Sequence, residues 1–177
     1  NVWLNISEIE TYGADLEVNW TSTLFDRPFA VRFLGAYQPH IFYRQPNVTG
    51  IDQGGVGFGP LGAAASPSVR LTGLVRFQPF ENFTVDLMER WRNSMHLGGD
   101  PTQNWVSNHV ESFATTNVNL AYRHETGGMT MEYYVNVQNV FNADAPNGAY
   151  SGNGTRAGLR DGFAMSDSPL GRFIWRA

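Results

Sequence analysis

The sequence predicts an all-β fold, a segment of a transmembrane antiparallel β-barrel. The main observation is a repeated alternation of apolar and polar residues over stretches of about ten positions. Within Tyr12–Trp20, every even-numbered residue is apolar or aromatic and every odd-numbered residue is polar or glycine. Because successive side chains of a β-strand point to opposite faces, such a stretch has one apolar and one polar face. In a membrane barrel, the apolar face contacts lipid and the polar face lines the lumen.

Two further observations favour the same fold class. Charged residues make up only 16% of the chain, whereas they make up about a quarter of a typical soluble globular protein. The alternating stretches are also long, while the strands of a soluble β-sandwich usually have about five or six residues. A barrel wall therefore explains the pattern better than a sandwich does.

The sequence predicts six long strands and a partial seventh, each placed where the alternation persists. They are Glu8–Thr21, Phe29–Phe42, Ser68–Gln78, Phe83–Leu97, Glu111–Arg123, Met129–Phe141 and Gly171–Ala177. The apolar face of the second strand carries Phe29, Val31, Phe33, Gly35 and Tyr37. That of the third carries Val69, Leu71, Gly73, Val75 and Phe77, and that of the sixth carries Met129, Met131, Tyr133, Val135 and Val137. The opposite faces include Arg32, Thr72 and Asn136.

The fourth strand contains one residue that departs from the pattern. Glu89 falls in the apolar phase, between Leu87 and Trp91. A charge facing lipid is disfavoured at the bilayer centre and costs less near the interface, which suits the position of Glu89 near the outer end of its strand. A β-bulge that shifts the phase of the strand is the alternative explanation.

The connections between the predicted strands alternate strictly in length. Residues 23–28, 79–82 and 124–128 form short connections, and residues 43–67, 98–109 and 142–170 form long ones. Outer-membrane barrels have short turns at the periplasmic rim and longer loops at the extracellular rim. A structureless loop of more than about 15 residues would count against a compact soluble domain. The alternation therefore also predicts which end of the sheet faces the outside.

Aromatic residues support this orientation. One group on the apolar face adjoins the short connections: Trp20, Phe29, Phe77, Phe83 and Tyr122. A second group adjoins the long ones: Tyr12, Tyr37, Trp91 and Phe113. Aromatic girdles of this kind mark the two interfaces of a membrane barrel.

Composition argues against several other classes of protein. The net charge of −4 offers no basic surface for nucleic acid. The absence of cysteine excludes disulfides and cysteine-ligated metals. Histidines are scattered, and no Ser/His/Asp set or carboxylate pair has a catalytic spacing, so we predict no enzymatic activity, no metal site and no cofactor. Gly57–Gly62 matches the nucleotide-binding pattern G-x-G-x-x-G, but Pro60 and the surrounding glycines indicate a flexible loop instead.

Three motifs resemble the C-terminal barrel of TonB-dependent outer-membrane receptors. Glu10–Glu17 (E-T-Y-G-A-D-L-E) is similar to the family's strand opening T-x-G-x-D/E-x-E. Asn136–Asn142 (N-V-Q-N-V-F-N) resembles N-V-x-N-L/V-F-D/N of the penultimate strand. Pro169–Phe173 (P-L-G-R-F) is similar to G-R-x-F/Y of the final strand. The motifs occur in the family's order and cover essentially the whole chain.

This resemblance implies that residues 1–177 are the C-terminal portion of a receptor barrel, about seven strands of a barrel of about 22. The family adds an N-terminal plug domain with a TonB box, and both the plug and the earlier strands are absent from this chain. The implied protein lies in the bacterial outer membrane and imports a scarce, large nutrient such as an iron–siderophore, cobalamin or a glycan. Its partners would be outer-membrane lipid, the remaining strands, the plug, TonB acting through the plug, and the nutrient ligand.

Candidate ligand contacts are aromatic residues of the long loops and arginines of the polar face. The aromatic candidates are Tyr43, Phe58, Trp105 and Tyr150, since binding residues concentrate on loops carried by a rigid scaffold. Five arginines share the polar face: Arg32, Arg70, Arg76, Arg90 and Arg92. A structural lattice of ion pairs explains most of them. Arg90 and Arg92, nearest the outside, are the candidates for attracting an anionic ligand.

Two alternatives remain open at this point. The chain could be a complete small barrel with a structural or adhesive role, in which Asn1–Asn5 belongs to an eighth strand that pairs with Gly171–Ala177. It could also be a soluble glycan-binding β-protein.

Overall fold

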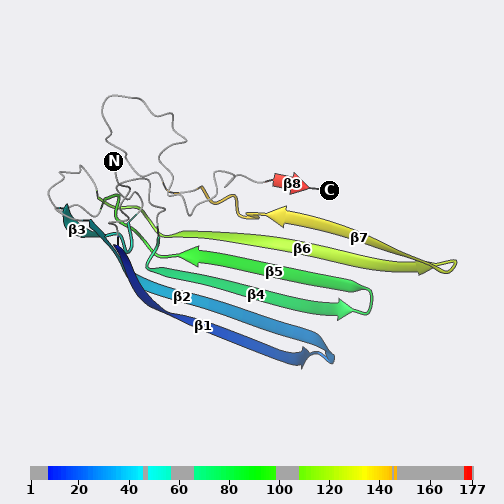
Figure 1. Cartoon of the computed structure of the whole chain (residues 1–177). Helices are drawn as coiled ribbons and strands as arrows, with labels where there is room; N and C mark the ends of the chain where they lie inside the picture. Colours follow the sequence, from blue (N-terminus) through cyan, green and yellow to red (C-terminus); the bar gives the residue numbers. More distant parts are fainter. Residues whose placement is uncertain are drawn as a thin grey trace, which may run out of the picture.

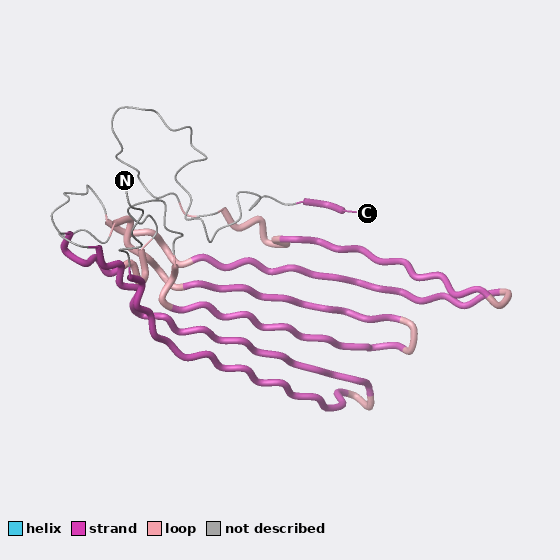
Figure 2. The backbone as a smooth tube through the Cα atoms, in the orientation of Figure 1, coloured by secondary structure: helices cyan, strands magenta, loops and turns pink. Residues whose placement is uncertain are grey.

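The computed structural model describes residues 8–45, 48–56, 66–98, 108–144, 146 and 174–176. These residues form one antiparallel β-sheet, and Figure 2 shows strands and loops but no helix among them. None of the described segments is a helix with the length and apolarity needed to cross a membrane. The predicted all-β antiparallel fold is confirmed.

The strands follow one another across the sheet in nearly the order of the sequence. They are β1 (Glu8–Leu24), β2 (Arg27–Gln45), β3 (Val48–Asp52), β4 (Val69–Phe80), β5 (Phe83–Arg92), β6 (Phe113–Thr126), β7 (Met129–Gln138) and β8 (Ile174–Arg176). The order is β1-β2-β4-β5-β6-β7-β8, with the short β3 paired to the outer part of β2. The short turns lie at one end of the sheet, and the connections after β2, β5 and β7 leave from the other (Figure 1).

The sheet is open over its described residues. β1 and β8 stand at opposite ends of the strand order and do not pair with each other. β8 pairs only with Asn136–Gln138 of β7. The closed eight-stranded alternative required pairing with Asn1–Asn5, which lies outside the described residues. The described sheet is an unclosed segment of a barrel-like wall.

The strand register confirms the predicted separation into an apolar and a polar face. Residues opposite each other in an antiparallel pair lie on the same face. One such row crosses six strands and is wholly apolar: Trp20, Val31, Val75, Leu87, Val118 and Val137. The adjacent row on the other face is mostly polar: Thr21, Ala30, Arg76, Asp86, Asn119 and Asn136.

Tight turns join the hairpins at the short-connection end. Phe25 and Asp26 have φ values of 54° and 58°, and Gly127 and Gly128 have φ values of 56° and 79°. Two consecutive residues with positive φ fit a type I′ turn, whose twist matches that of the flanking strands. The β6–β7 hairpin also projects beyond the β4–β5 turn (Figure 1), since Phe83–Tyr122 is the last β5–β6 pair and β6 continues to Thr126.

A bulge interrupts the β1–β2 ladder near the long-loop end. Between the pairs Ala14–Tyr37 and Tyr12–His40, β1 advances by two residues and β2 by three. Pro39 has no N–H to donate to a ladder and therefore suits this extra position. Gly13 faces the bulge, where a Cβ would lie 2.3 Å from the carbonyl oxygen of Tyr37. The bulge thus depends on Pro39 and Gly13. The alternation of apolar and polar residues did not predict a bulge at these two positions.

Several predicted strand ends are wrong because loop structure replaces the ladder there. β5 ends at Arg92, not at Leu97; Met95 and Leu97 are instead fully buried, in a cluster with Val110. β7 ends at Gln138, not at Phe141, because Asn139 takes a positive φ of 51° and its side chain bonds the backbone of Ala143.

Candidate ligand site on the polar face

The polar face carries an arginine group at its long-loop end. In the outermost row, Arg70 of β4 lies opposite Arg92 of β5, which lies opposite Phe113 of β6. In the next row, Arg90 lies between Thr72 and Thr115. Phe113 lies near the long connections, as expected from the sequence. Its register with Arg92 places it on the polar face, whereas Trp91 lies on the apolar face.

Two arginines deeper on this face are fixed by acids. Arg76 forms a bidentate pair with Asp86, with Nε–Oδ1 at 2.6 Å and Nη2–Oδ2 at 3.0 Å. The Nη2 atom of Arg32 lies 2.9 Å from Oε1 of Glu17, which also accepts a hydrogen bond of 2.8 Å from Asn19. These two arginines belong to a structural lattice of ion pairs.

Arg92 also has a structural position. Its residue exposure is only 5%, and its Nη1 donates to the carbonyl oxygens of Asn93 at 2.9 Å and Glu111 at 2.7 Å. Its guanidinium carbon lies 5.9 Å from the centre of the Phe113 ring, within the range of a cation–π contact. Arg92 therefore joins the end of β5 to the segment that enters β6.

Arg70 and Arg90 differ from Arg32, Arg76 and Arg92. Both side chains are exposed, and neither forms a hydrogen bond or ion pair with the described part of the chain. They occupy diagonal positions on adjacent strands, where the Cα atoms of an antiparallel pair lie about 7–8 Å apart. Two adjacent cations without an acid repel each other, so an anion between them would be stabilised. Arg70, which the sequence did not select as a ligand contact, joins Arg90 here.

The polar face also has a hollow of about 490 Å³, which lies closer to the short-turn end of the sheet than Arg70 and Arg90 do. Its lining includes amides and the ion-paired arginines, and it also includes the large apolar residues Leu74 and Met88, which the register places on the polar face. These two residues lie directly opposite each other on β4 and β5. The polar face is therefore not uniformly hydrophilic.

The aromatic candidates are only partly described by the structure. Tyr43 is half-buried in β2 and pairs with Ile9 of β1 and Ile51 of β3. Phe58, Trp105 and Tyr150 lie outside the described residues. Their role as ligand contacts stays a prediction.

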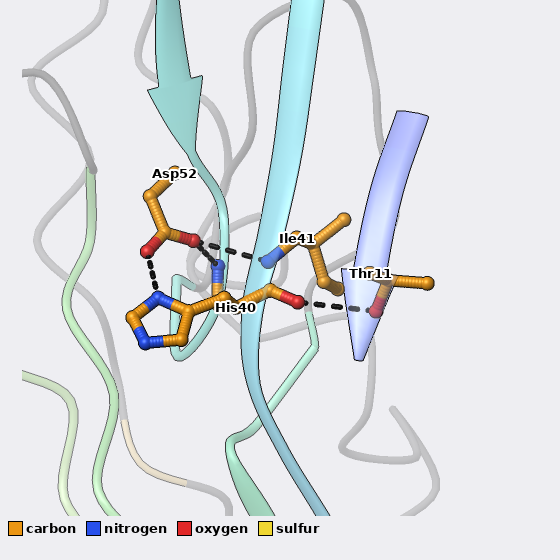
Figure 3. A network of polar contacts seen from close by, with 5 residues as sticks. Thr11, His40, Ile41 and Asp52 are labelled. Atoms are coloured by element: carbon orange, nitrogen blue, oxygen red, sulfur yellow. Dashed lines mark hydrogen bonds and ion pairs between the residues drawn. The ribbon is translucent and has the colours of Figure 1, made fainter. Parts of the chain in front are cut away.

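A polar network ties β3 to the outer end of β2 (Figure 3). His40 Nδ1 lies 2.5 Å from Asp52 Oδ2, while Asp52 Oδ1 accepts hydrogen bonds from the backbone N–H groups of Ile41 and Gly54. The Thr11 hydroxyl donates to the His40 carbonyl oxygen at 3.1 Å. Partial burial raises the pKa of Asp52, but the bonds from His40 and from the two N–H groups outweigh it and leave that pKa below its ordinary value. No group of three metal-binding side chains occurs within the described segments.

The fold and the two faces of the sheet define the class of this protein. It is an open antiparallel β-sheet with one continuous apolar face and one polar face that carries unpaired arginines. No family model and no curated protein matches the sequence. Among solved structures, the chain is similar to the crystal structure of the ferric-catecholate import receptor Fiu from E. coli K12 in its closed form, with 17% identity and a TM-score of 0.40. The similarity covers 78% of this chain and 21% of that receptor, so the chain spans about a fifth of the receptor's length.

Proposed function

We propose that this chain is a C-terminal wall segment of a TonB-dependent receptor in the bacterial outer membrane. The receptor imports a scarce, large nutrient such as an iron–siderophore, cobalamin or a glycan, and it is a transporter without enzymatic activity. One observation carries the proposal: the apolar face continues across six long strands, and its described side chains are half-exposed or exposed. Leu16 is 56% exposed, Trp20 55% and Tyr133 56%. A soluble protein rarely exposes so large a contiguous apolar surface, whereas a barrel wall presents it to lipid.

The open edges of the sheet support the same proposal. Unpaired backbone groups are not tolerated in hydrocarbon, so β1 and the free part of β7 need neighbouring strands. In a complete receptor, the remaining strands of the barrel supply them, and the plug occupies the lumen. The three stretches that resemble motifs of the family lie in β1, at the end of β7 and, in the sequence, just before β8, and they follow the family's order.

The receptor class is tested by uptake. The complete receptor is expressed in cells lacking their own receptors, with TonB present or deleted, and is offered a labelled iron–siderophore, labelled cobalamin or a labelled oligosaccharide. We expect at least one of the three to enter only when both the receptor and TonB are present. Uptake that is indifferent to TonB, or the absence of uptake for all three classes, would contradict the proposal.

Within this function, Arg70 and Arg90 are proposed to hold an anionic group of the nutrient at the mouth of the lumen. The double variant Arg70→Gln/Arg90→Gln should weaken binding of an anionic nutrient on the order of tenfold or more, and the loss should be largest at low salt. Arg123→Gln is the matched control, because Arg123 is an exposed arginine without an ion pair at the opposite end of the sheet. Equal affinities for all three proteins would exclude the arginine site.

A further inference from the structure

The bulge in the β1–β2 ladder shifts the alternation of β2 but not that of β1. Between the two flanking pairs, β2 has one more residue than β1. Beyond the bulge, Ile41 lies opposite Thr11, and Tyr43 lies opposite Ile9. Because β1 keeps its alternation, these residues lie on the side that forms the polar face of the long strands. No such shift occurs around Glu89, where the sequence also allowed a bulge.

The two sides of the sheet exchange their chemical character beyond the bulge. We call this part of the sheet the outer extension, and it comprises residues 8–12, 40–44 and 48–52. Its side that continues the apolar face is mainly charged and carries Glu8, Glu10, His40, Arg44 and Asp52. Such a set of charges would be costly in hydrocarbon, so the outer extension lies in water beyond the bilayer. The side that continues the polar face carries three large apolar residues: Ile9, Ile41 and Tyr43.

These three residues, called here the apolar wall, are incompletely covered. A sheet in water usually keeps its apolar side packed against other protein. Ile9 is 59% exposed, however, and Ile41 and Tyr43 are half-buried. The apolar wall therefore leaves apolar area free for a partner at the mouth of the lumen.

The polar side chain beside the apolar wall already has its hydrogen-bond partners. The Thr11 hydroxyl donates to the carbonyl oxygen of His40 at 3.1 Å (Figure 3) and accepts a hydrogen bond of 2.9 Å from Nε2 of Gln38. A ligand rich in hydroxyl groups would find few partners here, and its own polar groups would be left unsatisfied. The wall suits an apolar group instead, and the Tyr43 ring adds a large rigid contact area.

The size of the apolar wall indicates a small chemical group rather than a protein surface. A stable protein–protein interface buries about 800 Å² on each partner and involves about 20–30 residues a side. Three partly exposed side chains provide far less area than that. They can cover an aromatic ring or a short alkyl chain.

The apolar wall and the unpaired arginines lie on one side of the same sheet. Arg70 is opposite Ala36 of β2, and Ile41 follows Ala36 by five residues. This separation is at most about 17 Å along the strand, and the long side chain of Arg70 shortens it. One large nutrient can therefore contact both.

We propose that the apolar wall binds an aromatic ring or alkyl group of the nutrient whose anionic group is held by Arg70 and Arg90. The inference rests on the proposed function and narrows it to one substrate class. The nutrient is an anion that carries an apolar group, rather than a neutral glycan.

The test uses the complete receptor in nanodiscs and probes that differ only at their ends. Naphthoyl-tetraglycine has an apolar ring and a carboxylate, joined by four glycines that extend to about 14 Å. Acetyl-tetraglycine lacks the ring, and naphthoyl-tetraglycine amide lacks the charge. Saturation-transfer NMR measures the affinity of each probe, after subtraction of empty nanodiscs. The variants are Ile9→Gln, Arg70→Gln/Arg90→Gln and the matched control Leu24→Gln, which changes an exposed apolar residue at the opposite end of β1.

We expect the wild type and Leu24→Gln to bind naphthoyl-tetraglycine about tenfold more tightly than either of the other probes. Ile9→Gln should weaken both naphthoyl probes about three- to tenfold, because the exposed part of the wall is lost, and should leave acetyl-tetraglycine unchanged. The double arginine variant should weaken only the two probes with a carboxylate. Maltotriose, a neutral glycan, should not displace naphthoyl-tetraglycine at equal concentration.

Equal affinities of the wild type and Ile9→Gln for naphthoyl-tetraglycine, or its displacement by maltotriose, would overturn the inference. Photo-cross-linking of position 9 to another part of the receptor would also overturn it, because protein would then cover the wall. The uptake experiment separates this failure from failure of the proposed function. If uptake depends on TonB but the naphthoyl group gives no advantage, only the apolar wall is wrong. If no nutrient class enters in a TonB-dependent manner, the proposed function itself is wrong.

Discussion

Gly54 shows how a single missing side chain positions the outer loop. It has an ordinary backbone conformation, but an added Cβ would lie 2.0 Å from the carbonyl oxygen of Pro39. We predict that Gly54→Ala destabilises the outer end of the sheet by about 1–3 kcal/mol, the usual cost of overpacking. The temperature at which the barrel loses its compact mobility on SDS gels measures the effect. Gly73→Ala, which meets nothing within 4 Å, should leave that temperature nearly unchanged.

Arg90 and Arg92 should separate into a binding and a structural residue. Arg92→Gln removes the donor to two backbone carbonyl groups near a buried side chain, which costs about 1–3 kcal/mol. Arg90→Gln removes an exposed, unpaired cation and should leave stability within about 0.5 kcal/mol of the wild type. Heat denaturation and ligand affinity, measured on both variants, check the separation. A greater loss of stability for Arg90→Gln than for Arg92→Gln would refute this assignment.

Sequence alternation could place both arginines on the polar face but could not distinguish their surroundings. They are two residues apart and share the same phase, so the pattern treats them alike. Arg92 is buried because it contacts the backbone of the segments that follow β5 and precede β6. Loop segments of this kind have no repeating pattern of apolar and polar residues, so their positions could not be predicted. Arg70 was assigned to the polar face correctly. Its lack of an acidic partner could not be predicted, because it depends on which residues of the neighbouring strands lie beside it.

At the scale of elements, β3 is attached to the sheet by a titratable clamp. The pKa of Asp52 is lowered in the folded chain, because the bonds from His40 and the two N–H groups outweigh the effect of partial burial. A lowered pKa stabilises the clamp fully above the ordinary value for an aspartate, about 3.9, and this contribution is lost as the pH falls through the folded-state pKa. We predict that β3 loosens below about pH 4.

A nitroxide at the exposed position 50 of β3 would report this loosening as faster motion. In Asp52→Asn the motion should already be fast at neutral pH and should change little on acidification. Glu10→Gln removes a different ion pair nearby, with Arg44, and should keep the wild-type response. A response that survives in Asp52→Asn would show that another group titrates.

The strand ends and β3 mark the limit of prediction at this scale. The interiors of the long strands were predicted because each keeps a period of two over many residues. β3 has only five residues, includes Gly50 and lies in a stretch rich in glycine, so its alternation is too short to recognise. β5 was extended to Leu97 because apolar residues continue past Arg92. Those residues bury themselves among loop residues rather than in the ladder.

The whole-molecule arrangement followed from the connections more than from the strands. Short turns force neighbouring strands to pair, and alternating lengths place all long connections at one end, as the sheet shows. The closure of the sheet could not be derived, because nothing in the alternation says what pairs with the outer edges of β1 and β8, the two ends of the described strand order. What the two faces meet is likewise a property of the complete assembly.

Labelling both faces of the complete receptor in a lipid bilayer would show whether each face meets lipid, water or protein. Single cysteines carry a nitroxide at apolar-face positions Leu16, Val31, Leu71 and Val135, and at polar-face positions Thr21, Thr72, Thr115 and Tyr134. Oxygen concentrates in hydrocarbon, whereas a charged or polar nickel complex stays in water. The first group should therefore collide mainly with oxygen, because lipid surrounds it, and less often with nickel than the second group does. Plug contacts can lower nickel access at individual polar-face sites, but they cannot give the apolar-face sites access to oxygen. If the first group is shielded from both reagents, the apolar face packs inside a dry protein core, and a membrane wall is the wrong interpretation of this sheet.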